Sequence, residues 1–313
     1  MIQKRTIGIV GTGHVGVAAA YAVFLRGLCS EIILIDKNHE RAEGEAMDLM
    51  HGQAFGEPVT ARAGAYEDLD RAQLVVISAG VAQREGETRL DLLNRNADVF
   101  REIIGQLDRH APQAVLVIAT NPVDVLTYVS QKLSRRPGSR VIGTGTMLDT
   151  ARFRALLGRH YKVDPRSVHA YIVGEHGDSE VPLWSSARIG GVSLVDHTIS
   201  GHAFDKDAME ALFERVRNAA YDIISRKGYT NTAIGSAIAR LVEAVLADQG
   251  SVLPVGRLLE GHYAIDDVCL SIPTIVGSSG VREALLPQLS EDERAGLQHS
   301  ADVLKKSLRE LTL

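Results

Sequence analysis

The sequence predicts an α/β protein: a doubly wound parallel sheet in the first half, followed by a mixed α+β second half. Two observations in the first half indicate this class. Short β-branched runs alternate with longer stretches of helical spacing, and each run is too short for a buried helix. Such uninterrupted apolar runs are typical of parallel strands that are covered on both faces. With 313 residues, two domains are expected, and we place them at 1–147 and 148–313.

The first half contains five predicted strands. They are expected at 7–10, 32–35, 74–77, 115–119 and 141–142. Most are bounded by Gly, Asp, Asn or Pro, residues that favour turns. Between the strands, Val99, Ile103 and Leu107 show the spacing of one helix face.

The second half is less regular. Its expected elements are a helix over 149–160, a strand over 168–173, helices over 207–226 and 231–247, and strands over 251–255 and 268–272. A last helix should begin at Ser290, because Ser290 and Glu293 have the spacing of a capping box. This mixture predicts a catalytic domain of a different type from the first half.

Composition excludes several classes of function. Lys and Arg number 34 against 39 Asp and Glu, a formal charge of −5, whereas a nucleic-acid-binding protein needs a concentrated basic surface. The apolar stretch 17–25 is far shorter than the ~20 residues of a membrane helix. Cys29 and Cys269 form no CxxC pair, which favours a reducing compartment. We therefore expect a soluble, cytoplasmic protein with neither nucleic acid nor membrane as a partner.

A glycine motif follows the first predicted strand. Gly11, Gly13 and Gly16 lie in GTGHVG and precede an alanine-rich helix. Glycines allow a dinucleotide pyrophosphate to approach the backbone, and the helix amino terminus offers unpaired N–H groups. Asp36 ends the next strand, at the ~20-residue spacing expected of a carboxylate that binds ribose hydroxyls. This context predicts a Rossmann-type NAD site, because an acidic residue there disfavours NADP; the alternative is a structural glycine turn.

Two further pairs of small or polar residues follow strands. Ala79 and Gly80 end the third predicted strand, and Thr120 and Asn121 end the fourth. Doubly wound folds bind ligands at this edge of the sheet. Each pair could equally belong to an ordinary loop.

A possible site of proton transfer lies in the second half. His176 in GEHGD follows an apolar strand, although a histidine in such a segment is more often a surface loop residue. Asp149 and Arg152 are three apart on a predicted helix and share a face. An aspartate can orient an imidazole, and an arginine can grip a carboxylate with two hydrogen bonds. The alternative is a plain surface ion pair.

Two other patterns are less specific. The polar stretch 81–89 is compatible with a mobile lid or with a solvated loop. None of the 11 histidines belongs to an HExxH motif or a Cys/His cluster, so no metal is expected.

Six long motifs carry a resemblance that covers essentially the whole chain. They are GTGHVG, AGVAQREGETRLDLLNRN, ATNPVDV, LDTARFR, VHAYIVGEHGDSEVPLW and KGYTNTAIG. In these motifs the sequence resembles the bacterial L-lactate dehydrogenases of the lactate/malate dehydrogenase family. The resemblance implies reversible hydride transfer between NADH and pyruvate, giving L-lactate.

The resemblance also implies roles for individual residues. His176 would be the acid/base, Asp149 would favour its charged form, and Arg152 would bind the substrate carboxylate. Arg89, on a mobile loop over about 80–92, would polarise the substrate carbonyl. Asn121 and Thr230 would contact the substrate. The residues implied in NAD binding are Gly11, Gly13, Val15, Gly16, Asp36, Arg41, Tyr66, Ala79, Gly80, Thr120 and Asn121.

Gln83 bears on the choice of substrate. The malate dehydrogenases of this family usually have arginine there, which pairs with the second carboxylate of oxaloacetate. A neutral Gln83 cannot neutralise that charge in a closed site, so we expect pyruvate and lactate. Malate or another 2-hydroxy acid is the alternative. Glu85 stands where many relatives have proline, which implies a more mobile open loop.

Regulation is implied by two further residues. In bacterial relatives, the arginine of RFR and the histidine of VHAY bind fructose 1,6-bisphosphate across a subunit interface. This chain has both, as Arg154 and His169. The resemblance thus implies a homotetramer activated by that sugar bisphosphate, although both residues could be inert surface groups.

Overall fold

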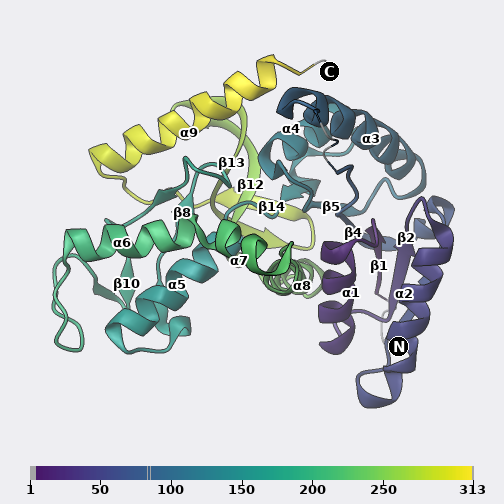
Figure 1. Ribbon diagram of the computed structural model, residues 1–313, viewed down its shortest axis with the longest axis horizontal. Coiled ribbons are helices and arrows are strands. Elements are labelled where there is room, and N and C mark those ends of the chain that lie inside the picture. Colours follow the sequence, from purple (N-terminus) through teal and green to yellow (C-terminus); the bar gives the residue numbers. More distant parts are fainter. Residues whose placement is uncertain (1–4, 83, 85, 312–313) are drawn as a thin grey trace.

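The computed structural model describes residues 5–82, 84 and 86–311, and within that range it leaves the Arg89 side chain undescribed. Gln83 and Glu85 therefore lie outside the described residues. Helices flank a long twisted sheet, and the last helix runs along one side of the molecule (Figure 1). Within the described ranges, every helix is too short or too polar to cross a membrane.

The described part of the first half supplies six strands. They are β1 (Thr6–Val10), β2 (Glu31–Ile35), β3 (Thr60–Ala63), β4 (Ala72–Ile77), β5 (Val115–Ile118) and β6 (Val141–Gly143). The second half adds β7 (Val168–His169), β8 (Ile172–Val173), β9 (Val181–Pro182), β10 (Arg188–Ile189), β11 (Val192–Ser193), β12 (Ser251–His262), β13 (Ile265–Gly277) and β14 (Gly280–Ala284).

The α-helices alternate with the strands in the first half and cluster in the second. They are α1 (His14–Leu25), α2 (His39–His51), α3 (Arg89–His110), α4 (Val123–Leu133), α5 (Met147–Tyr161), α6 (Lys206–Arg217), α7 (Ala219–Lys227), α8 (Thr232–Leu246) and α9 (Glu291–Arg309). The short 3-10 helices of the described residues are η1 (Gln53–Phe55), η2 (Tyr66–Leu69), η3 (Gly138–Arg140) and η4 (Pro165–Ser167).

One sheet spans both halves of the chain. In the described residues its order is β3-β2-β1-β4-β5-β6-β12-β13-β14. The strands from β3 to β6 are parallel, in the 3-2-1-4-5-6 order of a dinucleotide-binding sheet. The antiparallel β12–β13 hairpin continues the sheet through one pairing, Gly256 with Gly143. The predicted α/β class is therefore confirmed.

Apolar residues on both faces of the sheet form two large cores. Helices α3, α4 and α9 pack on one face, and α1, α2 and α8 pack on the other. Helix α8 comes from the second half of the chain but covers strands of the first half. The uninterrupted burial of β1 and β5 explains why their sequences are continuously apolar.

A third, smaller core joins α5 and α6 to the short strands around β7, β8 and β10. Phe153 and Tyr161 of α5 are fully buried in it. This core fixes the helix that carries Asp149 and Arg152.

Most predicted elements are confirmed, with shifts at their ends. The capping box at Ser290 begins α9 as expected, with the Ser290 hydroxyl accepting a hydrogen bond from the N–H of Glu293. Strands β3, β9, β10, β11 and β14 were not predicted from the sequence. Strands β9, β10 and β11 have only two residues each. Strands β3 and β14 are short, lie at the two edges of the large sheet and are incompletely buried.

Three predictions need correction. The expected strand over 168–173 is two strands, β7 and β8, in different sheets. The expected helix over 207–226 is broken at Asn218, which caps α6 and precedes α7. The loop predicted over 80–92 ends earlier, because Thr88 and Asp91 form a capping box that begins α3 at Arg89.

Candidate active site

The glycine motif forms a tight turn between β1 and α1. Gly11 has φ +99°, and a Cβ there would lie 2.5 Å from the backbone nitrogen of Ala79. A Cβ on Gly16 would collide with the carbonyl oxygen of Gly11. A Cβ on Gly13, in contrast, would meet no atom of the described residues within 4 Å. The chain itself needs glycine at positions 11 and 16. The space beside Gly13 is open, so a pyrophosphate can approach the backbone there.

Asp36 lies beside this turn at the end of β2. Its Oδ2 accepts hydrogen bonds from the backbone N–H (2.7 Å) and hydroxyl (3.0 Å) of Thr12, and its Oδ1 accepts one from the N–H of Asn38 (3.0 Å). Burial alone would raise the pKa of Asp36, but these hydrogen bonds and the charge of Arg41 lower it below its usual value. A charged carboxylate is thus held next to the glycine turn, as ribose binding requires.

The other residues expected to contact NAD lie nearby. Val15 is in the first turn of α1, and Arg41 is exposed on α2. Tyr66 begins η2 and is half-buried; burial and then the charges of Glu102 and Asp36 raise its pKa to about 12. Arg41 thus lies on the helix that follows β2, and Tyr66 lies on the 3-10 helix that follows β3.

The ends of β4 and β5 meet at the same edge. The hydroxyl of Thr120 donates a hydrogen bond to the carbonyl of Ala79 (2.7 Å), and a Cβ on Gly80 would lie 2.7 Å from Cγ2 of Thr120. Asn121 follows and lines a cavity. The structure therefore brings together both pairs of residues that the sequence placed at strand ends.

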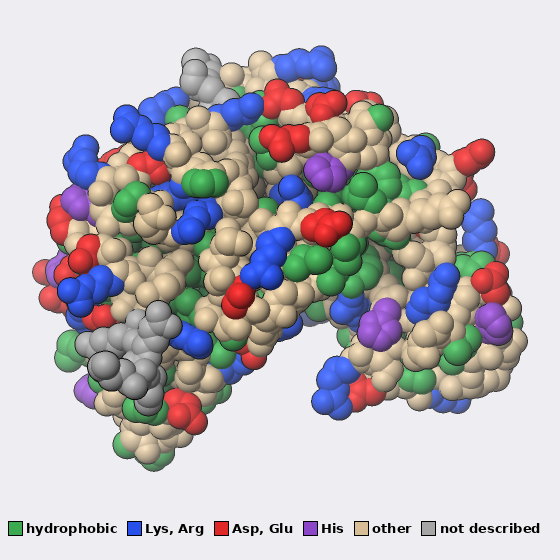
Figure 2. All heavy atoms as spheres, turned by 180° about the vertical axis from the view of Figure 1, so that it is seen from behind, with side chains coloured by type: hydrophobic (Ala, Val, Ile, Leu, Met, Phe, Trp, Pro, Cys, Tyr) green, Lys and Arg blue, Asp and Glu red, His purple; other side chains and the backbone are tan. Residues whose placement is uncertain are grey.

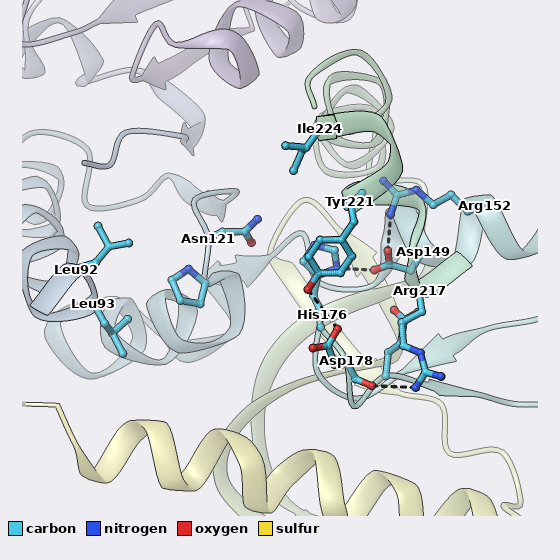
Figure 3. Close-up of a pocket in the computed structure, with 14 residues that line it drawn as sticks. Leu92, Leu93, Asn121, Asp149, Arg152, His176, Asp178, Arg217, Tyr221 and Ile224 are labelled. Carbon is cyan, nitrogen blue, oxygen red and sulfur yellow. Dashed lines mark hydrogen bonds and ion pairs between the residues drawn. The ribbon is translucent and has the colours of Figure 1, made fainter. Parts of the chain in front are cut away.

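This cavity has a volume of about 480 Å³ and lies between the two halves of the chain. Leu92, Leu93 and Asn121 line one side, and His176, Arg152 and Tyr221 line the other (Figure 3). Asn121 and Pro122, which follow β5, are part of its lining. A small organic molecule would fit in it.

Three side chains in the cavity form a connected group. Nδ1 of His176 lies 2.5 Å from Oδ2 of Asp149, and Nη1 of Arg152 donates to Oδ1 of Asp149 at 2.9 Å. Asp149 is almost fully buried, whereas about a quarter of the His176 side chain is exposed. Burial opposes a positive charge on His176, but the charge and hydrogen bond of Asp149 raise its pKa to about 9. The imidazole is therefore protonated at neutral pH, with Nε2 available to donate.

Local structure explains this geometry. Asp149 and Arg152 lie one turn apart in α5, whose first turn is tied to β8: the hydroxyl of Thr146 donates to the carbonyl of Ile172 (2.6 Å), and the Ile172 N–H donates to Thr150 (2.9 Å). Directly after β8, Gly174 has φ +92° and turns the chain so that His176 faces α5.

Comparison with known protein families assigns nearly the whole chain to one family. Residues 5–143 match the family profile of the lactate/malate dehydrogenase NAD binding domain, and residues 146–312 match that of the family's alpha/beta C-terminal domain. The chain belongs to the lactate/malate dehydrogenase family. Because the first of these domains binds NAD, the protein is an NAD-dependent oxidoreductase.

Individual members of the family are similar over nearly their full length. An L-lactate dehydrogenase of Salinibacter ruber is 60% identical, with 100% of this chain and 99% of the relative covered. One of Thermus aquaticus is 50% identical, with 96% and 97% covered. The crystal structure of a minor L-lactate dehydrogenase from Enterococcus mundtii, in a ligands-bound form, has a TM-score of 0.96 at 43% identity and 99% coverage of both chains.

The family site contains two buried carboxyl groups that the sequence analysis did not select. Oδ2 of Asp124 accepts a hydrogen bond from the backbone N–H of His176 (2.7 Å), while its Oδ1 has no partner among the described residues. Burial raises the pKa of Asp124 to about 7. Glu180 lines the cavity, and burial and the charge of Asp149 raise its pKa to about 8. Asp124 could have been selected from the sequence, because it follows soon after β5, at the edge of the sheet where ligands bind.

The remaining predicted site residues lie apart from the cavity or outside the description. Arg89 is the first residue of α3 and so does not lie on the loop; its side chain is not described. Thr230 lies in the turn between α7 and α8 and is not among the described residues that line the cavity. Within the described ranges, no three His, Cys, Asp or Glu side chains gather as metal ligands.

Arg154 lies beside the end of β7, the strand that His169 ends. Nε of Arg154 donates to the carbonyl of Ala170 at 2.9 Å, and its guanidinium lies 4.7 Å from the ring centre of Tyr171. His169 ends β7, directly before Ala170, and is exposed. The two predicted effector residues are thus neighbours through Ala170.

Proposed function

We propose that this family member is an L-lactate dehydrogenase that interconverts pyruvate and L-lactate with NADH and NAD. The observation that carries the proposal is the connected group of His176, Asp149 and Arg152, which faces a cavity beside the strand ends of the NAD domain. A proton donor and a carboxylate-binding cation in one cavity are the two groups that a 2-keto acid needs.

Each residue has a distinct task in pyruvate reduction. Arg152 binds the substrate carboxylate with the N–H groups that it does not use to bind Asp149. Protonated His176 donates from Nε2 to the carbonyl oxygen as the hydroxyl forms, and Asp149 fixes the ring through Nδ1. NADH, when bound, supplies the hydride. In lactate oxidation, neutral His176 accepts the hydroxyl proton.

The connected group matches one substrate carboxylate. Arg152 and protonated His176 carry two positive charges against the one negative charge of Asp149, so a single substrate carboxylate makes this group neutral. Arg217 and Asp178, of opposite charge, also line the cavity. We assign the discrimination against dicarboxylates to neutral Gln83, and the polarisation of the carbonyl to Arg89.

Steady-state assays test this assignment. The oxidation of NADH is followed with pyruvate and with oxaloacetate as separate substrates. We expect kcat/KM to favour pyruvate clearly. A preference for oxaloacetate would instead identify a malate dehydrogenase, and NADH binding without turnover of any 2-keto acid would indicate a cofactor-binding protein that has lost catalysis.

We also propose activation by fructose 1,6-bisphosphate. The neighbouring positions of Arg154 and exposed His169 support a phosphate site on this surface. Addition of the sugar bisphosphate should lower the pyruvate concentration at half-maximal rate, and Arg154→Gln should remove the response. Arg166→Gln is the matched control, because Arg166 is exposed and pairs with Asp164. A response that survives Arg154→Gln contradicts this site.

We also propose that the protein forms a homotetramer and that it is located in the cytoplasm. Met47 on α2 is 61% exposed, and Phe55 in the following η1 is 89% exposed. A contiguous apolar surface patch favours a subunit contact, and we propose that these two side chains belong to such a patch. Cys29 and Cys269 are both buried as free thiols, which supports a reducing compartment. Light scattering of the purified protein should give four times the chain mass; a monomer contradicts the assembly.

A further inference from the structure

Two aromatic rings join the cofactor turn to the wall of the substrate cavity. His14, the first residue of α1 and part of the glycine motif, stacks on Tyr229, with ring centres 3.8 Å apart and planes within 3° of parallel. Tyr229 lies in the turn between α7 and α8, directly before Thr230. The two residues are far apart in the sequence, so the stack is a contact between the two halves of the chain.

The two sides of this stack differ in how firmly they are held. Helix α1 buries Ala19, Ala20 and Val23, and it packs tightly on α8, where a Cβ on Gly235 would lie 2.7 Å from the backbone of Ala18. Helix α7, which is described over its whole length, has no buried residue. Removal of the stack should therefore free α7 and leave α1 in place.

Helix α7 also has little support on its cavity side. Its residues Ala220, Tyr221 and Ile224 line the cavity, and Figure 3 shows Tyr221 and Ile224 projecting toward the space opposite Asn121. The Tyr221 hydroxyl reaches Asp178 only at 3.4 Å. At its carboxyl end, α7 stops at Gly228, whose φ of +85° turns the chain directly into Tyr229.

The turn between α7 and α8 is stabilised by contacts of its own residues. Nζ of Lys227 lies 4.6 Å from the ring centre of Tyr229 and donates to Oδ1 of Asn231 at 2.8 Å. The end of α7, the ring of Tyr229 and the start of α8 thus form one unit. The ring of His14 joins this unit to the cofactor turn.

We propose that His14 and Tyr229 are positioning residues. Their stack holds α7, which forms a wall of the substrate cavity, in a fixed position relative to the turn that binds the cofactor. The proposal deepens the proposed function and rests on it for the identity of the substrate. Neither ring touches the reacting atoms. The effect of the stack is on substrate affinity, because it limits the positions available to α7.

Hydrogen–deuterium exchange tests the anchoring without any need for turnover. In Tyr229→Ala and in His14→Ala, amides over 219–228 should exchange faster than in the wild type, while amides over 16–25 of α1 keep their protection. Tyr229→Phe, which keeps a stackable ring, should resemble the wild type. Unchanged exchange of α7 in both alanine variants overturns the proposal, and the use of two variants guards against one that fails to fold.

Kinetics then test the consequence for the substrate. Each alanine variant should raise KM for pyruvate by about 2- to 12-fold, the range expected for an aromatic pair. Tyr229→Ala, which lies outside the cofactor turn, should also leave the Kd for NADH within about twofold. The double variant should show no larger effect than either single variant. Tyr21→Ala, an exposed tyrosine on the same helix, is the control. If the two single-variant increases in KM multiply in the double variant, the proposal is overturned. Absence of turnover in the wild type would reject the proposed function but not the exchange result.

Discussion

Asp149 holds His176 by its ring nitrogen, with 2.5 Å between Oδ2 and Nδ1, while its other carboxylate oxygen binds Arg152. One buried carboxylate thus orients both the proton donor and the cation that binds the substrate. Because both contacts are made by one side chain, proton transfer and substrate binding both depend on the position of Asp149.

Removal of the imidazole should separate catalysis from cofactor binding. His176→Asn cannot transfer a proton, so we expect kcat for pyruvate reduction to fall by about 10²- to 10⁴-fold. NADH affinity, measured by fluorescence titration, should change little, because the cofactor turn is formed by other residues. His299→Asn, an exposed histidine on α9, is the control. Near-normal turnover of His176→Asn would assign the proton transfer to another group.

The pKa of His176 sets a pH dependence with a defined sign. Pyruvate reduction needs the protonated ring, whose pKa is about 9, so the rate should fall as pH rises through that value. Lactate oxidation needs the neutral ring and should rise over the same interval. Asp149→Asn removes the charge that raises this pKa and should move both limbs to lower pH. pH profiles of kcat/KM measure the shift; limbs that do not move would exclude Asp149 as its cause.

Gln83→Arg should change substrate preference. An added cation can pair with the second carboxylate of oxaloacetate, so the ratio of kcat/KM for oxaloacetate to that for pyruvate should rise by about 10-fold or more. Gln83→Lys, a cation without the planar fork, should give a smaller shift. The same ratio in all three proteins would place the discrimination elsewhere.

Gly13 and Gly44 provide a matched pair. A Cβ at either position meets no atom of the described residues within 4 Å, so both alanine variants should fold. Gly13→Ala fills the space beside the α1 amino terminus and should weaken NADH binding by about 10-fold or more. Gly44→Ala lies within α2 and should raise stability by up to about 1 kcal/mol with unchanged NADH affinity. Calorimetry and fluorescence titration distinguish the two; equal NADH affinity in both variants would contradict the cofactor site.

The buried carboxylate of Asp124 gives a prediction about stability. A Cβ on Gly256 would lie 3.4 Å from Oδ1 of Asp124, an ordinary contact, so a serine hydroxyl there can donate to this oxygen. Gly256→Ser should stabilise the fold by about 1–2 kcal/mol, because it satisfies a buried acceptor. Gly256→Ala fills the space without a donor and should gain less. Denaturant unfolding compares them; equal effects would show that the hydroxyl does not reach Asp124.

The sequence was informative where a local rule determines the structure. Continuous apolar runs located the parallel strands, and the ~20-residue interval from Gly16 to Asp36 located the cofactor edge. The break at Asn218 was missed, because apolar residues continue at helical spacing on both sides of it. The contact of Asp149 with His176 depends on how α5 packs against β8, which no local pattern encodes.

Surface chemistry was informative to a smaller degree. On the face shown in Figure 2, Lys and Arg side chains are interspersed with Asp and Glu, as a formal charge of −5 allows. Net charge gives no information on the position of the anion-binding side chains. Arg152 was found because it lies one turn from Asp149, and the stack of His14 with Tyr229 joins residues too distant in the sequence to be paired from it.

The pairing of Gly256 with Gly143 makes β12 the neighbour of β6 in one sheet. Truncation after residue 147 would uncover the edge of β6 and remove α8 from the core it shares with α1 and α2. Unpaired sheet edges recruit strands from other molecules. An isolated NAD-binding fragment of this chain should therefore aggregate during expression, and the protein should unfold in a single cooperative transition in spite of its two-part sequence.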